Sequence, residues 1–380
     1  MLTEPIRELT QRIKSVEEGE SARPEGEPLF EVGRMLAGAA TLYEKVRYLI
    51  DYREEHTVRR AALERILKRR VFIEQKAESG AVLLQELVDG KYISKEEATE
   101  QTARDIDIII GRYITLWRIR QTGAGTGRRL ISFAATEIDA RISPLQYAID
   151  TESAEALYKT LQSHVSARGA SVEMVNEQLY CACWRTLLSA DNDRLAYALW
   201  LFYVPEWKSG NADSPAIASR LPALLEKIRS AVENVLQWQI APKIKNESIY
   251  FRIIREVLIE HEGGAGRVLE SASELDTFTR EFLEKKYEKE NERIQSSGIR
   301  AVVYLFFTKM AVALILELPY EIFFLDGVNY LPLSINILFH PLLLFTLTRR
   351  TGALGEANTE AIMRGLHAVL YEGTVRSILV

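Results

Sequence analysis

Four side chains that could bind an ion or carry a proton interrupt two apolar stretches near the C-terminal end of this 380-residue sequence: Lys309, Glu317, Asn336 and His340. Glu317 follows Lys309 by eight residues, and His340 follows Asn336 by four. In a helix, both spacings place the two side chains along roughly one face. Because an ionisable group in hydrocarbon costs at least about 2.5 kcal/mol, such groups normally face a protein partner or a water-filled cavity. We therefore expect these residues to form an intramembrane polar layer.

Two roles are open for this polar layer. If the chain folds back near Asp326, we expect Lys309 to come level with Asn336 and within reach of His340. Several chains could then line a polar path, since two helices per chain are too few to enclose a pore. Alternatively, the four groups satisfy one another inside a hairpin or an oligomer and conduct nothing.

The stretches that carry these residues, Ala301–Leu318 and Val328–Thr348, are each close to the 20 or so residues that a helix needs to cross a bilayer. Basic residues flank only their outer ends: Lys285, Lys286, Lys289, Arg293, Arg300, Arg349 and Arg350. Because such residues are retained on the cytoplasmic side, both termini should be cytoplasmic. The sequence predicts a multi-pass protein of the plasma (inner) membrane. A buried hairpin in a soluble protein is the alternative.

A dense basic run, RRAALERILKRR, offers a second candidate site: Arg59, Arg60, Lys68, Arg69 and Arg70. In a protein tied to a membrane, we expect these residues to form a basic surface for lipid headgroups or a partner. The alternative is a solvated helix face that Glu54, Glu55 and Glu64 partly neutralise. The run holds no aromatic residue to stack on bases, and the net charge is −5, so the sequence argues against nucleic acid as a partner.

The sequence predicts no catalytic, metal-binding or cofactor-binding residue. Cys181 and Cys183 lie two residues apart in a predicted helix and point away from each other, so we expect two buried, reduced thiols. The five histidines form no HExxH pattern. Gly123, Gly125 and Gly127 have the spacing of neither a P-loop nor a dinucleotide-binding turn, and we interpret their segment as a flexible joint.

Helical periodicity without alternating strands predicts an all-α fold, with a multi-helix cytoplasmic region followed by a C-terminal two-helix transmembrane hairpin. Ser94 with Glu97 should open a helix toward Arg120, and Ser271 with Glu274 should open a charged helix before the hairpin. Further helices are expected over 41–72, 81–88, 130–140, 151–167, 172–189, 193–203, 216–240 and 248–261. The expected parts are an N-terminal helix and flexible linker (1–40), a helical subdomain (41–122), a helical domain ending in a juxtamembrane helix (129–298), the hairpin (299–350) and a cytoplasmic amphipathic tail (351–380).

These observations favour a membrane-anchored scaffold or adaptor that recruits protein partners through helix surfaces, as a homo-oligomer. A subunit of an oligomeric channel or transporter, built around Lys309 and His340, is the alternative, and a membrane-tethered enzyme is the third hypothesis. The N-terminus has no apolar segment, so no cleavable signal peptide is expected.

Overall fold

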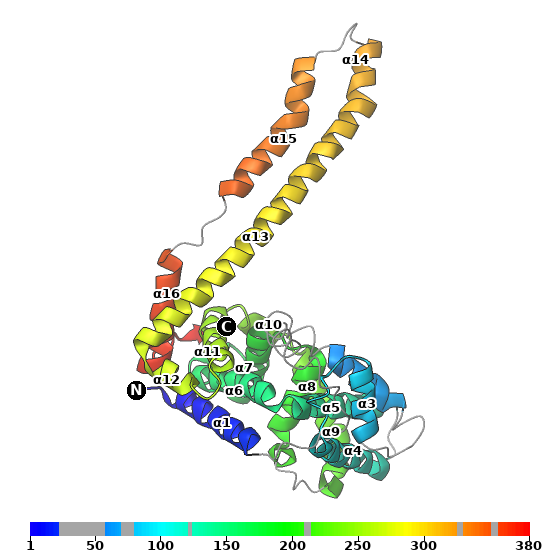
Figure 1. Cartoon of the computed structure of the whole chain (residues 1–380), viewed down its shortest axis with the longest axis vertical. Coiled ribbons are helices and arrows are strands. Elements are labelled where there is room, and N and C mark those ends of the chain that lie inside the picture. Colours follow the sequence, from blue (N-terminus) through cyan, green and yellow to red (C-terminus); the bar gives the residue numbers. More distant parts are fainter. Residues whose placement is uncertain (23–57, 70–79, 121–123, 209–213, 325–329, 351–355) are drawn as a thin grey trace, which may run out of the picture. The chain divides into compact units, whose positions relative to one another are not determined.

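The computed structural model describes residues 1–22, 58–69, 80–120, 124–208, 214–324, 330–350 and 356–380 (Figure 1). These residues form two compact units. Residues 1–270 and 368–380 make up one, called here the helical unit, and residues 271–367 make up the other, the hairpin unit. Both consist of helices, which confirms the all-α prediction.

The described residues of the helical unit form eleven numbered α-helices and one further helix, without a number, over residues 58–69. The first helices are α1 (Glu4–Ser21), α3 (Gly80–Asp89), α4 (Glu100–Arg120), α5 (Ala124–Ile142), α6 (Pro144–Leu161), α7 (Val172–Leu188) and α8 (Asn192–Tyr203). They are followed by the 3-10 turn η2 (Pro205–Trp207), α9 (Ser214–Glu233), α10 (Leu236–Ile240), α11 (Lys245–Glu260), α12 (Ala265–Glu270) and the π-turn η4 (Ala368–Glu372). The described strands, β1 (Val165–Ser166) and β2 (Ile378–Leu379), pair in parallel over two residues.

Helix starts follow local capping chemistry, but not always at the expected residue. Ser94 and Glu97 exchange the two hydrogen bonds of a capping box, at 2.7 and 3.4 Å. The box closes a turn, however, and α4 begins only at Glu100, because Thr99 Oγ1 accepts a hydrogen bond from Thr102 N at 3.1 Å. The helix expected over 151–167 begins earlier, at Pro144, where proline is preorganised for a first helical turn.

The glycine-rich segment is helical from Ala124 onward, which corrects the expectation of a joint extending to residue 129. Gly125 and Gly127 lie in the first turns of α5, while Gly123 lies outside the described residues. A Cβ atom at position 127 would lie 2.4 Å from Trp117 Cζ3 of α4. Glycine therefore allows the Trp117 ring to pack directly on the α5 backbone.

The core of the helical unit combines large aromatic rings with the buried carboxylate of Asp150. Trp184, Trp200 and Trp207 are each at most 1% exposed. Asp150 on α6 is also 1% exposed, and accepts hydrogen bonds from Arg255 Nε of α11 and Arg194 Nη2 of α8, both at 2.6 Å. Burial alone would raise the pKa of Asp150, but the two guanidinium groups outweigh it and hold this pKa below its usual value. The carboxylate is therefore charged at neutral pH and joins three helices.

The hairpin unit contains α13 (Ala272–Val312), the π-turn η3 (Ala313–Glu317), α14 (Leu318–Phe324), α15 (Tyr330–Arg350) and α16 (Glu356–His367). Ser271 Oγ accepts a hydrogen bond from Glu274 N at 3.4 Å, so α13 starts where the sequence predicts. The helix then continues past residue 298, since no proline interrupts it before Pro319. Close to the start of α13, helix α16 packs against it: His367 Nε2 of α16 lies 2.8 Å from Asp276 Oδ1 of α13.

The segment after the hairpin divides between the two units instead of forming one tail. Residues up to His367 belong to the hairpin unit, and those from Ala368 belong to the helical unit. There, Thr3 N donates to Leu370 O at 2.7 Å, and Tyr371 Oη donates to Leu269 O at 2.8 Å. The helical unit is thus built from two separate parts of the chain.

Replacing Gly127 by alanine should destabilise the helical unit, because the added Cβ would displace the Trp117 ring. We expect Gly127→Ala to lower the free energy of unfolding by about 1–3 kcal/mol, measured by urea unfolding followed by circular dichroism. Gly125→Ala is the matched control, since its Cβ meets no atom within 4 Å. It should be neutral or stabilising by up to about 1 kcal/mol. Equal shifts for the two variants would contradict the Trp117 contact.

Candidate functional site: the polar groups of the apolar hairpin

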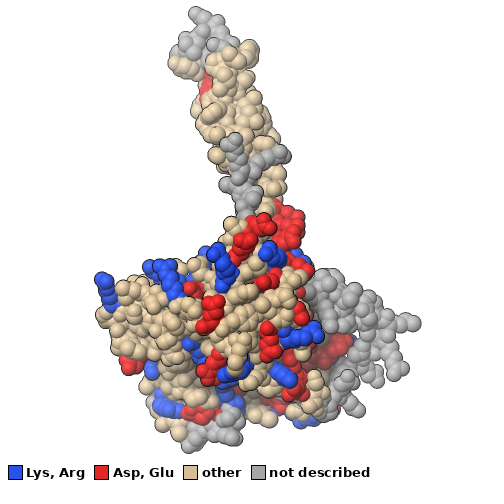
Figure 2. Space-filling view, turned by 90° about the vertical axis from the view of Figure 1, so that its left-hand side faces the viewer, with Lys and Arg blue, Asp and Glu red and all other residues tan. Residues whose placement is uncertain are grey.

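The hairpin unit holds two helices long and apolar enough to cross a membrane, over Ala272–Tyr320 and Tyr330–Leu347. Only 6% of the most apolar part of each is buried. The exposed side chains are large and apolar, as at Phe307, Leu316 and Leu331, and Figure 2 shows the corresponding surface almost entirely without charge. This exposure argues against a hairpin that forms the core of a soluble protein.

A π-turn interrupts the first apolar helix next to its carboxylate. Leu318 N donates to Ala313 O, five residues back, and the wider turn ends at Glu317. Pro319 accounts for it, because proline has no N–H to donate and its ring would meet the carbonyl group of Ile315. Such turns change the direction of the side chains they contain. Here, the π-turn ends at the residue that contacts the second helix.

The structure brings two of the four polar-layer residues together. Asn336 Nδ2 donates to Glu317 Oε1 at 2.6 Å, and both side chains are half-buried. Ala313 and Pro341 are the buried residues in the described part of 301–347, so backbone approaches backbone closely near this pair. The pair satisfies part of the hydrogen-bonding capacity of both groups inside an apolar hairpin.

The register of this pair separates Lys309 from Glu317 and Asn336. Lys309 lies eight residues before Glu317, and Leu344 lies eight residues after Asn336, so Lys309 is level with Leu344. Along the helix axis, this places Lys309 about 12 Å from Asn336. The expectation that Lys309 is level with Asn336 is therefore wrong. Among the described residues, the half-buried side chain of Lys309 has no hydrogen bond or ion pair, while its carbonyl oxygen accepts from Ala313 N within the helix. His340 is exposed, with its ring against Phe339.

Three arginines of the basic run form ion pairs with other parts of the helical unit. Arg59 is 4% exposed, its Nε donates to Asp139 of α5, and its Nη2 donates to Ser143 Oγ at 3.0 Å. An exposed role for Arg59 is thus corrected, since its guanidinium is enclosed by these groups. Arg69 remains on the surface, bound to Glu86 of α3, and Lys68 is exposed. Arg70 lies outside the described residues.

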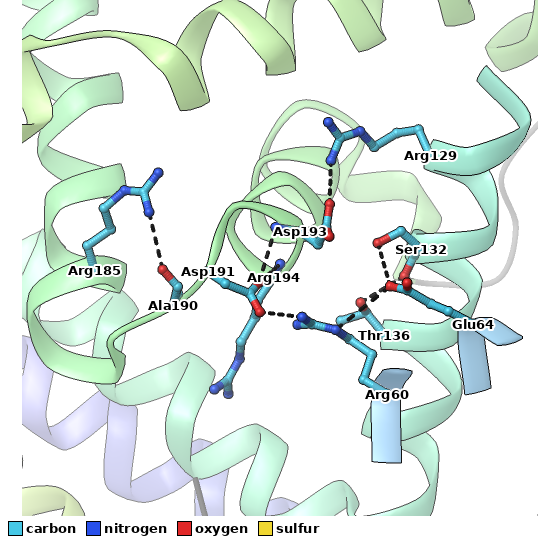
Figure 3. Close-up of polar contacts among 10 residues, drawn as sticks. All are labelled: Arg60, Glu64, Arg129, Ser132, Thr136, Arg185, Ala190, Asp191, Asp193 and Arg194. Carbon is cyan, nitrogen blue, oxygen red and sulfur yellow. Dashed lines mark hydrogen bonds and ion pairs between the residues drawn. The ribbon is translucent and has the colours of Figure 1, made fainter. Parts of the chain in front are cut away.

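Arg60 joins the same helix to the start of α8 (Figure 3). It donates to Asp191, whose Oδ1 caps α8 by accepting from Arg194 N at 2.8 Å. Burial would raise the pKa of Asp191, but the Arg60 guanidinium and the backbone N–H groups of α8 outweigh it and lower this pKa. Glu64 accepts from Ser132 Oγ of α5 at 3.0 Å, beside this contact. The run therefore fixes residues 58–69 against three helices.

The surroundings of the two cysteines indicate structural thiols, not reactive ones. Cys181 and Cys183 are free and buried, as predicted from their spacing. Burial raises the pKa of the Cys181 thiol to about 12, so it stays protonated at neutral pH. Within the described ranges, no three His, Cys, Asp or Glu side chains gather as a metal site would require.

Comparison of the chain with protein families, with curated proteins and with solved structures gives no match. The site is therefore interpreted from its own geometry. The partners that sequence reasoning missed, Asp139 and Asp191, lie 80 and 131 residues from Arg59 and Arg60. No local signal relates residues so far apart in the sequence.

Removing the carboxylate beside Arg59 should destabilise the helical unit strongly. Asp139→Ala leaves a buried guanidinium without its counter-charge, and we expect a loss of about 3–5 kcal/mol in the free energy of unfolding. Glu100→Ala, which removes an exposed ion pair with Arg104, serves as the control and should cost no more than about 1 kcal/mol. Similar losses for the two variants, measured by urea unfolding, would show that the ion pair between Asp139 and Arg59 does not stabilise the unit.

The register of the hairpin can be tested by cysteine cross-linking in the membrane-bound chain. Glu317→Cys combined with Asn336→Cys should be cross-linked by a short bismaleimide, because the native side chains at these two positions meet at 2.6 Å. Lys309→Cys combined with Asn336→Cys should not, since about 12 Å of helix axis separates the two positions. Cross-linking of the second pair alone would support the register in which Lys309 is level with Asn336.

Proposed function

We propose that this chain is a membrane-anchored helical scaffold or adaptor. The hairpin anchors it in the plasma (inner) membrane, both termini are cytoplasmic, and the helical unit recruits protein partners through its helix surfaces. The observation that carries this proposal is the exposure of two long apolar helices, since so much exposed apolar surface is unfavourable in water. The hydrogen bond between Glu317 and Asn336 supports a structural role for the polar layer in place of a conduit.

A homo-oligomer is part of the proposal, and a shallow apolar groove on the first membrane helix supports it. Two of its lining residues, Thr308 and Ala311, are small and lie between larger ones in the sequence. The lining residues are Tyr304, Phe307, Thr308, Ala311, Val312, Ile315 and Leu316. Small residues between large ones allow a second helix to approach closely in a bilayer.

The proposed topology predicts which positions a membrane-impermeant maleimide can reach. In sealed inverted vesicles, Ser297→Cys should be labelled because it precedes the first apolar stretch on the cytoplasmic side. Phe323→Cys, in α14 at the other end of that stretch, should be labelled only after the vesicles are opened with detergent. The buried Cys181 and Cys183 should give little background.

Two results would contradict the anchor. Release of the chain by an alkaline wash would show that the hairpin does not span the bilayer. Labelling of both positions before detergent is added would show that the hairpin does not separate two compartments.

A further inference from the structure

The segment between α9 and α11, which includes α10, exposes apolar and basic side chains that the proposed function does not use. Trp238 is 57% exposed and Val235 is 65% exposed, whereas Trp184, Trp200 and Trp207 are buried. Lys243 and Lys245 are exposed on the same segment, and residues 234–246 contain no acidic residue. We refer to Val235, Trp238, Lys243 and Lys245 as the Trp238 patch.

A buried glutamine fixes the backbone beneath this patch. Gln237 Nε2 donates to three carbonyl groups at the end of α9: those of Ala231 at 3.2 Å, Val232 at 2.8 Å and Asn234 at 2.8 Å. The last turn of a helix lacks N–H groups for its carbonyl groups. Ala231 O and Val232 O also accept longer hydrogen bonds, from Asn234 N and Arg185 Nη2, both at 3.4 Å, so Gln237 provides the shorter contact in each case. Gln237 is thus drawn inward, and its neighbour Trp238 is directed outward.

An arginine holds the Trp238 ring in place. The Arg185 guanidinium carbon lies 4.5 Å from the centroid of the ring, in cation–π contact. Arg185 is itself fixed, since its Nε donates to Gln237 Oε1 at 2.6 Å and its Nη2 donates to Asn192 Oδ1 at 2.8 Å. One face of the tryptophan therefore rests on a cation while much of the ring stays exposed. The display of this ring is preorganised.

The charge and chemistry of the patch favour an anionic lipid surface as its occupant. Tryptophan prefers the membrane–water interface, where its ring meets acyl chains and its N–H stays hydrated. Among the described residues, neither Lys243 nor Lys245 has an ion pair, so both ammonium groups are available to headgroup phosphates. Val235 adds apolar surface on the same turn.

We propose that the Trp238 patch is a second membrane contact, through which the helical unit binds the anionic lipids of the cytoplasmic leaflet of the bilayer that the hairpin crosses. The proposal rests on the proposed membrane anchor and adds to it a lipid-binding surface outside the hairpin. Acyl chains next to the headgroups would contact Val235 and Trp238, and lipid phosphates would pair with Lys243 and Lys245. The patch would thereby restrict how the helical unit is oriented on the bilayer.

Tryptophan fluorescence in reconstituted vesicles tests this contact with the full chain. The vesicles contain phosphatidylcholine and phosphatidylglycerol, and one lipid carries bromine on its acyl chain near the headgroup, where it quenches tryptophan on contact. Trp184, Trp200 and Trp207 are buried and Trp117 is half-buried, so most of the quenching should vanish in Trp238→Phe. Lys243→Glu combined with Lys245→Glu should reduce the Trp238-dependent quenching at least about twofold, as should high salt or omission of phosphatidylglycerol.

Lys95→Glu is the matched control, because it reverses an exposed charge on another part of the same unit and should leave the quenching unchanged. If brominated lipid does not quench the Trp238-dependent emission while aqueous acrylamide does, the patch faces water and the lipid contact is overturned in favour of a protein partner. Failure of the anchor is distinguishable, since the chain would then leave the vesicles in an alkaline wash whatever the state of Trp238. A chain that never floats with the vesicles would overturn both proposals.

Discussion

The helical unit depends on the buried carboxylate of Asp150. It lies 1% exposed between α6, α8 and α11, and two arginines compensate its charge. A charge so enclosed requires its partners, so each helix is held at the distance and rotation at which the three side chains meet. The position of α8 matters further, because Asp191 at its start holds Arg60 and with it the helix over residues 58–69. Two sets of ion pairs, joined through α8, thus connect α11 with the N-terminal half of the unit.

The same ion pairs show where sequence reasoning succeeds and where it ends. Helix 172–189 could be predicted almost to the residue, because its apolar period and its cap at Ser171 are local signals. The ion pair between Arg59 and Asp139 could not be predicted, since a basic run has the same local pattern whether it faces water or a carboxylate 80 residues away. The segment around Gly127 was predicted as a joint because glycine usually breaks a helix, whereas here it makes room for Trp117.

In the hairpin, the polar residues and the point of reversal were predicted, but the residue level with Lys309 was not. The pairing of Glu317 with Asn336 is centred between Asp326 and Gly327 in the sequence, close to the expected point of reversal. From that point, however, Lys309 is more distant along the chain than Asn336, so the two could not be level. The π-turn had one visible cause in the sequence, Pro319, but its effect on the direction of Glu317 depends on the helix that it meets.

The path of the chain through its two units has a consequence for biosynthesis. Strand β2 and the turn at Ala368–Glu372 follow the hairpin in sequence, yet they pair with β1 and with Thr3 in the helical unit. A ribosome synthesises the hairpin before it synthesises these residues, so the unit is still open when the apolar helices emerge. If the hairpin enters a bilayer as proposed, insertion comes first, and the last strand then completes a domain whose two chain connections already lead to the membrane.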